Sequence, residues 1–273
     1  MIVFRKIIAV VATLVLAVCL VGLGFLACIA PPVTHVLSSF FSNDSVSPFN
    51  RTQLTQVADA TRDYSFGDHD QAALYRAIYQ IDLQYRQEVI TSNGELPTDF
   101  PALDIVADAN DAKQLAAAFA GASELYCYSP QTVSHLDDCY NVAHTGIIVL
   151  IICGIAAVTG LILCGVLGRK RLVGNVVMSS GIVVLAVFVG LGVWAFIDFN
   201  GLFTMFHQVF FAQGNWTFPY DSLLICALPT EFWIGMGVIW LIVAVLISIL
   251  SIAIGTKGLK TAPPGRPEGL SLV

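Results

Sequence analysis

Residues 146–197, GIIVLIICGIAAVTGLILCGVLGRKRLVGNVVMSSGIVVLAVFVGLGVWAFI, decide the fold of this chain. The stretch holds two apolar runs, Gly146–Leu167 and Leu172–Ile197, and neither contains a charged residue. About 20 apolar residues are enough for an α-helix to cross roughly 30 Å of hydrocarbon. Because the bilayer core has no water to pair with backbone groups, each run must be helical there. The stretch therefore predicts two transmembrane helices joined by a short basic turn, 168–171.

Two further apolar runs of spanning length lie toward the ends of the chain, within residues 1–30 and 233–255. The 273 residues have a mean hydropathy of +0.78, and only 12% of them are charged, which is typical of a membrane protein. The first run also has some likeness to a lipoprotein signal peptide ending at Cys28, but it is long for one. We therefore expect an uncleaved anchor and an all-α integral membrane protein with four transmembrane helices.

The positions of Lys and Arg predict the orientation, because cytoplasmic flanks of transmembrane helices are rich in them. With four spans, eight basic residues fall on one side, which we expect to be cytoplasmic: Arg5, Lys6, Arg169, Lys170, Arg171, Lys257, Lys260 and Arg266. The other side receives residues 31–145, which hold five basic and fifteen acidic residues. Such an acidic surface argues against nucleic-acid binding.

The expected organisation follows from these spans and this orientation. It comprises transmembrane helices at 1–30, 146–167, 172–197 and 233–255, a mostly helical extracytoplasmic cap at 31–145, a cytoplasmic turn at 168–171, an extracytoplasmic interfacial segment at 198–232 and a cytoplasmic tail at 256–273.

Capping residues and, for the third helix, alanine-rich apolar spacing predict four helices in the cap. They begin after Asn50, after Asp70, at Asp104 with an end near Ala122, and after Ser129. Cys127 and Cys139 also lie on this side of the membrane, where a disulfide is permitted, but their spacing leaves open whether they pair.

Histidines are the main candidates for chemistry, because the chain has no GxSxG, Walker or HExxH motif and its apolar spans hold no chain of ionisable residues. His35 and His69 lie in polar, loop-like sequence and are expected to be exposed, and His144 is expected at the membrane interface. His135 lies three residues before Asp138, so the two share a helix face, and the carboxylate can fix the tautomer of the ring. A plain surface pair is the simpler interpretation of this spacing.

His207 lies in the interfacial segment beside four phenylalanines at helical spacing: Phe199, Phe203, Phe206 and Phe210. An aromatic belt with a structural histidine is the simpler interpretation. Trp216 and Asp221 follow in a loop, where the first can donate one hydrogen bond and the second can accept several.

A series of motifs carries a family resemblance. It runs His135-x-x-Asp138, then Asp-Phe-x-x-x-Phe-Thr-x-Phe-His-x-x-Phe-Phe from Asp198, then Trp216, Asp-x-Leu-Leu-Ile from Asp221, and Pro-x-x-Phe-Trp from Pro229. This pattern resembles the bacterial integral membrane family of the lipoprotein intramolecular transacylase, Lit. Two positions depart from it: Cys139 stands where the family commonly has valine, and Glu231 lies one position late.

The resemblance implies an acyltransferase that needs no cofactor or metal. It would act at the extracytoplasmic face of the bacterial cytoplasmic membrane, in contact with membrane lipid, on lipoproteins whose N-terminal cysteine carries a diacylglyceryl group. The sn-2 acyl chain would move to the α-amino group of the same cysteine, which gives the lyso form.

His135 and His207 would share the acid and base roles of this reaction. Asp138 would orient His135, and the four phenylalanines would contact acyl chains. Trp216 would steady the tetrahedral oxyanion, with Tyr64 as a weaker candidate for that role and Asp221 as a supporting residue.

Two other functions fit the same residues. His135, Asp138, His207 and Asp221 could ligate a divalent metal that activates water, as in a membrane hydrolase. Alternatively, the chain could be a non-enzymatic partner protein of an envelope complex, in which case both histidines would tolerate Asn or Gln.

Overall fold

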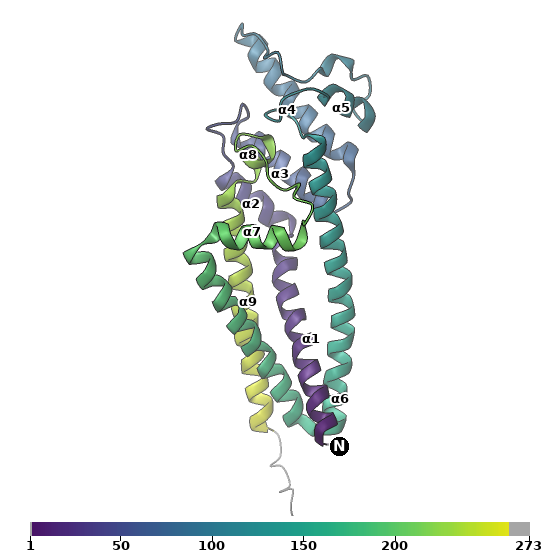
Figure 1. Cartoon of the computed structure of the whole chain (residues 1–273), viewed down its shortest axis with the longest axis vertical. Helices are drawn as coiled ribbons and strands as arrows, with labels where there is room; N and C mark the ends of the chain where they lie inside the picture. Colours follow the sequence, from purple (N-terminus) through teal and green to yellow (C-terminus); the bar gives the residue numbers. More distant parts are fainter. Residues whose placement is uncertain (1, 262–273) are drawn as a thin grey trace, which may run out of the picture. The chain divides into compact units, whose positions relative to one another are not determined.

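The computed structural model describes residues 2–261, and this part of the chain is helical without strands (Figure 1). Its elements are α1 Ile2–Cys28, α2 Pro31–Phe41, α3 Arg51–Phe66, α4 Gln71–Thr91, the 3-10 turn η1 Leu103–Ile105, α5 Ala112–Phe119, α6 Pro130–Ile197, α7 Phe199–Phe210, α8 Leu223–Ala227 and α9 Thr230–Thr261. The predicted all-α class is confirmed.

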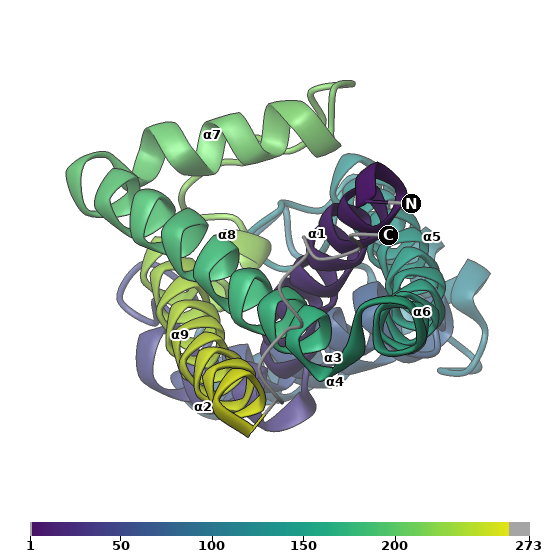
Figure 2. The ribbon, with the colours of Figure 1, turned by 90° about the horizontal axis from the view of Figure 1, so that it is seen from below.

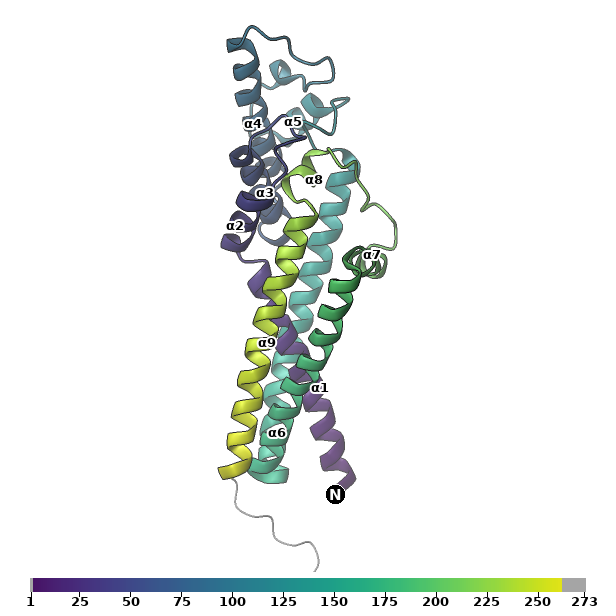
Figure 3. The same cartoon turned by 90° about the vertical axis from the view of Figure 1, so that its left-hand side faces the viewer.

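Four helical segments are long and apolar enough to cross a membrane: Val3–Cys28, Pro130–Leu167, Lys170–Ile197 and Thr230–Thr261. Two of them belong to α6, in which helical structure continues through the predicted turn 168–171 while the chain reverses direction (Figure 3). Helix α9 extends through residues 256–261, which we predicted as part of the tail. The rest of the predicted tail, 262–273, lies outside the described residues.

The chain forms two compact units. The first comprises the described residues of Met1–Gly24, Ile148–Val193 and Leu241–Val273. These residues belong to α1, α6 and α9, which Figure 2 shows from below. Small residues allow close approach of the helices in this unit, as is common in membranes. A Cβ added to Gly255 would lie 2.5 Å from the backbone nitrogen of Met178 and 2.7 Å from the carbonyl oxygen of Gly174. Packing of α6 against α9 therefore requires glycine.

The second unit comprises Phe25–Ile147 and Trp194–Trp240. One apolar core holds it together, and the largest side chains that are fully buried in it are Phe49, Leu54, Leu74, Ile78, Ile81, Leu115, Leu223 and Phe232. These residues come from α3, α4, α5, α8, α9 and the loop before α3, so the core joins the cap to the segment that follows α7.

Three of the predicted helix starts in the cap are confirmed. Asn50 caps α3 through a capping box with Gln53, Asp70 accepts hydrogen bonds from the first turn of α4, and Ser129 caps α6. These starts are local features, because a side-chain oxygen accepts from an otherwise unpaired N–H of the first turn.

The predicted helix from Asp104 to Ala122 is wrong. The stretch forms η1 and the shorter α5, which starts after Asp111. Between them the Gln114 side chain accepts hydrogen bonds from the backbone N–H groups of Ala107 and Asp108. Side chains that satisfy backbone groups in this way offer the chain an alternative to a helix.

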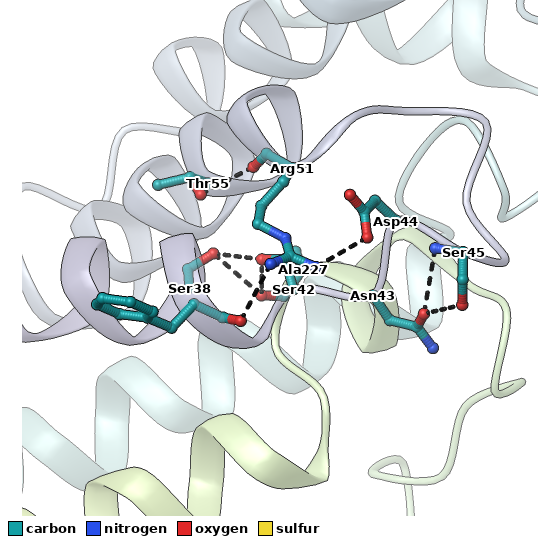
Figure 4. Close-up of polar contacts among 9 residues, drawn as sticks. Ser38, Ser42, Asn43, Asp44, Ser45, Arg51, Thr55 and Ala227 are labelled. Carbon is teal, nitrogen blue, oxygen red and sulfur yellow. Dashed lines mark hydrogen bonds and ion pairs between the residues drawn. The ribbon is translucent and has the colours of Figure 1, made fainter.

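A buried polar contact joins α2 to the end of α8 (Figure 4). Ser38 Oγ lies 2.6 Å from Ser42 Oγ, and both hydroxyls can donate to the carbonyl oxygen of Ala227, at 3.3 and 3.1 Å. Each hydroxyl has one proton, so one serine donates to the other, and the serine that accepts this bond donates to Ala227. The contact fixes the link between α8 and α9.

Candidate active site

Helix α7 carries one of the two key histidines. Asp198 begins the helix as its N-cap and accepts a hydrogen bond from the N–H of Gly201 at 2.8 Å. His207 lies in the last turn and is only 8% exposed, whereas Phe206 and Phe210 on neighbouring positions are 40% and 47% exposed. The helix therefore turns a histidine inward and leaves aromatic side chains on its outer side.

The hydrogen bond of His207 defines its neutral form. Its Nδ1 lies 2.8 Å from the carbonyl oxygen of Phe203. A carbonyl oxygen only accepts, so Nδ1 carries the proton and Nε2 keeps the lone pair. Burial lowers the pKa of His207 below its ordinary value, although the hydrogen bond to Phe203 acts in the opposite direction. The imidazole is therefore neutral at pH 7, with Nε2 free to act as a base.

His135 lies on α6, in the second turn after the Ser129 cap, and is 7% exposed. Its ring centroid is 6.2 Å from that of His207. The structure thus brings together two histidines that are 72 positions apart in the sequence. His135 Nε2 lies 3.6 Å from Cys139 Sγ, whereas its buried Nδ1 has no standard hydrogen bond.

Aromatic side chains surround the two histidines. Phe211, which is buried, has its ring centroid 4.8 Å from that of His135 and 5.5 Å from that of His207. Trp216 lies 4.9 Å from His207, and Phe218 lies 5.6 Å from His135. The pair is consequently placed in a largely apolar environment, where electrostatic effects are stronger than in water.

The four predicted acyl-contact residues lie at different distances from the pair. Phe203 and Phe206 contact the His207 ring directly, with centroid distances of 4.0 and 5.5 Å. Phe210 contacts Phe206 at 4.7 Å, and Phe199 contacts Phe203 at 6.0 Å. The four therefore form a continuous aromatic strip along α7, which runs away from His207 in both directions.

Asp138 is placed differently from our prediction, in which it orients His135 directly. In the described structure no hydrogen bond joins the two. Instead, one carboxylate oxygen, Oδ2, accepts from Gln213 Nε2 at 2.5 Å and from Asn215 Nδ2 at 2.7 Å. Asp138 therefore holds the loop between α7 and α8 against α6.

Two other predicted supporting residues do not reach the histidine pair. Tyr64, which is buried, donates a hydrogen bond to Asp137 at 2.5 Å, and burial together with this carboxylate raises the pKa of the phenol. The backbone carbonyl of Asp221 accepts from Cys226 Sγ, and no hydrogen bond or ion pair joins the Asp221 side chain to either histidine in the described structure. Trp216 is the one predicted oxyanion contact that lies beside His207.

The metal alternative is not supported by the geometry. Within residues 2–261, no three side chains of His, Cys, Asp or Glu come together in an arrangement that could hold a metal ion. One carboxylate oxygen of Asp138 is instead bound by two amide donors, and the four residues of the proposed metal set are not gathered into a metal-binding group in the described part of the chain.

The family model of the lipoprotein intramolecular transacylase Lit matches residues 79–233, which is more than half of the chain and includes both histidines. The chain belongs to the Lit family. An uncharacterized protein of Aquifex aeolicus (strain VF5) is 31% identical over 86 residues, which are 32% of this chain and 40% of that relative. The aligned region therefore spans less than half the length of this relative.

Solved structures have the same fold. That of the membrane integral lipoprotein intramolecular transacylase Lit from Bacillus cereus matches with a TM-score of 0.66 at 16% identity, over 95% of this chain and 98% of the other. A variant of the same Lit protein with one histidine changed to arginine matches with a TM-score of 0.62 at 16% identity, over 94% and 92% of the two chains.

Several residues of this candidate site were missed from the sequence. Phe211 and Phe218 pack on His135, and Gln213 and Asn215 hold Asp138. For the two amides, the available signal was the Gln-Gly-Asn sequence at 213–215, in the loop that follows α7. Gly214 has a φ of 77°, a left-handed conformation that glycine adopts without strain.

A second aromatic cluster, which includes Tyr140 of α6, corrects our expectation for His69. We predicted an exposed loop residue, but its ring stacks between Tyr64 and Tyr140, with centroid distances of 4.2 and 4.0 Å. Its Nδ1 also lies 2.9 Å from the carbonyl oxygen of Tyr64, which holds the residue at a φ of 55°. The cluster fastens the loop after α3 to α6, on the side that carries Asp137.

Cys127 and Cys139 are both free thiols. Cys127 is buried and donates toward the carbonyl oxygens of Phe119 and Ser123, whereas Cys139 faces His135. Cys139 therefore places a thiol beside one of the two histidines.

Proposed function

We propose that this protein is an intramolecular transacylase that moves the sn-2 acyl chain of a diacylglyceryl-cysteine lipoprotein to the α-amino group of that cysteine. One observation carries the proposal: His135 and His207, both buried, lie with their rings 6.2 Å apart within an aromatic site, in a chain of the Lit family. Both reacting groups belong to one substrate, so the main task of the protein is to hold them together and move protons.

The reaction moves three protons: two protons leave the nitrogen, and one reaches the departing sn-2 oxygen. The α-amino group has an ordinary pKa of about 8, so at neutral pH it is mostly an ammonium and must lose a proton before it attacks. The nitrogen then forms a bond to the ester carbonyl carbon, which gives a tetrahedral oxyanion. The second proton then passes from the nitrogen to a histidine of the pair, the bond to the sn-2 oxygen breaks, and that oxygen takes the same proton from the histidinium. An ester becomes an amide, and one proton is released overall when the ammonium form reacts.

The hydrogen bonding of His207 supports it as the base that first meets the amino group. Its Nδ1–H is held by the carbonyl oxygen of Phe203, so Nε2 is the accepting nitrogen. Because burial lowers its pKa, the ring stays neutral where an exposed histidine would begin to protonate. His135 is then the second member of the pair, which gives the proton to the departing oxygen.

The aromatic side chains around the pair suit a lipid substrate. Phe203, Phe206 and Trp216 contact His207 and can pack against acyl chains next to the ester. The partly exposed Trp216 also has an indole N–H that could donate to the oxyanion. In this proposal the site faces the extracytoplasmic side of the membrane, where mature lipoproteins present their lipidated N-terminus.

The test uses a diacylated lipopeptide with a deuterated sn-2 chain. Substrate and product have the same mass because the transfer is intramolecular, so the assay must read fragment ions in tandem mass spectrometry. The expected product keeps the deuterated chain on the peptide after loss of the glyceryl thioether.

Three matched variants complete this test. His135→Gln and His207→Gln are each expected to abolish product formation. His35→Gln, at a side chain that is 62% exposed, is expected to retain it. Full activity in both of the first two variants would refute the proposal. Release of free fatty acid instead of the lyso form would indicate a hydrolase, and an unchanged lipopeptide would indicate a non-enzymatic protein.

A further inference from the structure

Two buried polar atoms of the site have no standard hydrogen bond, and their chemistry is complementary. They are His135 Nδ1 and Asn215 Oδ1. The Asn215 side chain lies beside His135, because its Nδ2 approaches the side chains of Ser134 and Asp138, one residue before and three residues after His135 on α6. Burial lowers the pKa of His135 to about 4, and the Asn215 side chain acts in the opposite direction. Burying both polar atoms without pairing them would be costly.

The orientation of the Asn215 amide follows from its other partners. Its Nδ2 is 2.7 Å from Asp138 Oδ2 and 3.5 Å from Ser134 Oγ. An ionised carboxylate only accepts hydrogen bonds, so the NH₂ group must face Asp138. The amide oxygen is therefore turned away from Asp138, which leaves it available to the ring of His135.

Several contacts hold the Asn215 amide and the rest of the loop between α7 and α8 in place. Gln213 and Asn215 donate to the same carboxylate oxygen, and Gly214 lies between them with a φ of 77°. In addition, the side chain of Gln131 on α6 donates to the carbonyl oxygen of Thr217 at 3.3 Å. The backbone of the loop and its side chains are thus both tied to α6 on either side of Asn215.

We propose that Asn215 is a positioning residue whose side-chain oxygen accepts the Nδ1–H of His135 and so keeps Nε2 as the proton-accepting nitrogen of that ring. In this arrangement the Asn215 amide oxygen fixes the tautomer of His135, just as the backbone carbonyl of Phe203 fixes the tautomer of His207. Asp138 acts one step further away, because it holds the amide in the orientation that makes its oxygen face the ring. This inference rests on the proposed function, in which both histidines move protons.

A chemical reason favours an amide over a carboxylate at this position. In the proposed reaction the proton on His135 must pass to the glycerol oxygen. An aspartate directly on Nδ1 would stabilise the histidinium strongly and so hold back that proton. A neutral amide oxygen fixes the tautomer with a weaker effect on proton affinity.

The test reads the tautomer of His135 independently of the reaction. Full-length protein in detergent, labelled with ¹⁵N-histidine, is studied by NMR at pH 8, and the His135 signals are assigned from their loss in His135→Gln. The expected wild-type spectrum shows a single neutral tautomer with the proton on Nδ1. Asn215→Ala is expected to show a mixture or the Nε2–H form, and to lower kcat about tenfold, the equivalent of one hydrogen bond.

Two further variants separate positioning from loop anchoring. Gln213→Ala removes the other amide donor to Asp138 without removing a neighbour of His135, so it is expected to keep the wild-type tautomer. Asn215→Leu fills nearly the same volume without any polar atom, so it removes the oxygen from His135 and is expected to change the tautomer as Asn215→Ala does. It serves as the second test of the oxygen if Asn215→Ala does not fold.

The outcomes distinguish this inference from the proposed function. An Nε2–H tautomer in the wild type, or an unchanged tautomer in folded Asn215→Ala, would overturn the role of Asn215 whatever the activity. A tautomer that changes as expected, in a protein that never forms the lyso product, would support the positioning role and refute the transacylase.

Discussion

Asp82→Asn is expected to stabilise the protein by several kcal/mol at neutral pH. Asp82 on α4 is fully buried, with 0% exposure, and neither carboxylate oxygen has a hydrogen-bond partner. Burial raises the pKa of this carboxyl from 3.8 to about 9. The folded cap therefore keeps Asp82 as a neutral acid at pH 7, whereas the unfolded chain ionises it.

The sign and size of the effect follow from proton linkage. Between about pH 4 and pH 9 the folded state binds one more proton than the unfolded state, so the free energy of unfolding falls as the pH rises. Each pH unit lowers the free energy of unfolding by about 1.4 kcal/mol, which amounts to about 4 kcal/mol between pH 4 and pH 7. Asparagine is neutral in both states and removes this slope.

The assay is thermal unfolding of the full chain in one detergent at pH 5, 6, 7 and 8. The gap between Asp82→Asn and the wild type is expected to widen by about 4 kcal/mol over these three units, or on the order of 10 °C in Tm. Asp68→Asn, at an exposed position, is the control and should follow the wild type. Parallel curves for Asp82→Asn and the wild type would refute the reasoning, because they would mean that Asp82 is ionised in the folded cap.

Three other predictions concern the site and the packing of the helices. Gly214→Ala and Gly121→Ala both place a Cβ in open space at positive φ, so each should lower the free energy of unfolding by about 1 kcal/mol. Only Gly214→Ala should also reduce transacylation, and equal activities of the two variants would contradict the role of the loop. Gly255→Val should lower the Tm in detergent strongly and Gly190→Val, which has open space, should not; similar Tm values would refute the close packing. In the pH profile of kcat, the midpoint of the acid limb should lie below pH 6.5, because burial lowers the pKa of His207 and the base is lost only when that ring protonates. A midpoint above pH 6.5 would exclude His207 as the base.

Much of the fold was predictable because its signals are local. The apolar runs predict spanning helices from the cost of unpaired backbone groups in hydrocarbon, and Asn50, Asp70 and Ser129 mark helix starts through bonds within one turn. The failure between Asp104 and Ala122 has a physical cause as well. Alanine-rich spacing favours a helix there, but Asp111 caps a new helix and the Gln114 side chain satisfies the backbone before it.

The candidate site was predictable only in part. His135 and His207 were identified from their neighbours in the sequence, yet no local rule places α6 and α7 side by side, and their meeting depends on the folding of the intervening 71 residues. The acidic residue was also misjudged. A spacing of three residues places Asp138 on the same helix face as His135. This spacing cannot predict that Asn215, 77 positions downstream in a loop, donates to the Asp138 carboxylate.

The side-chain amides of Gln213 and Asn215 were overlooked because their partner, Asp138, lies far away in the sequence. Gln and Asn next to glycine are ordinarily interpreted as turn formers, because their side chains bond to nearby backbone. Here both instead bond to one distant carboxylate, and the left-handed Gly214 between them aims the two side chains at the same oxygen. A loop that served only to connect α7 with α8 would need neither amide. The arrangement is explained if the loop has to hold one amide oxygen at the Nδ1 side of His135, and the tautomer of that ring is the measurement that decides it.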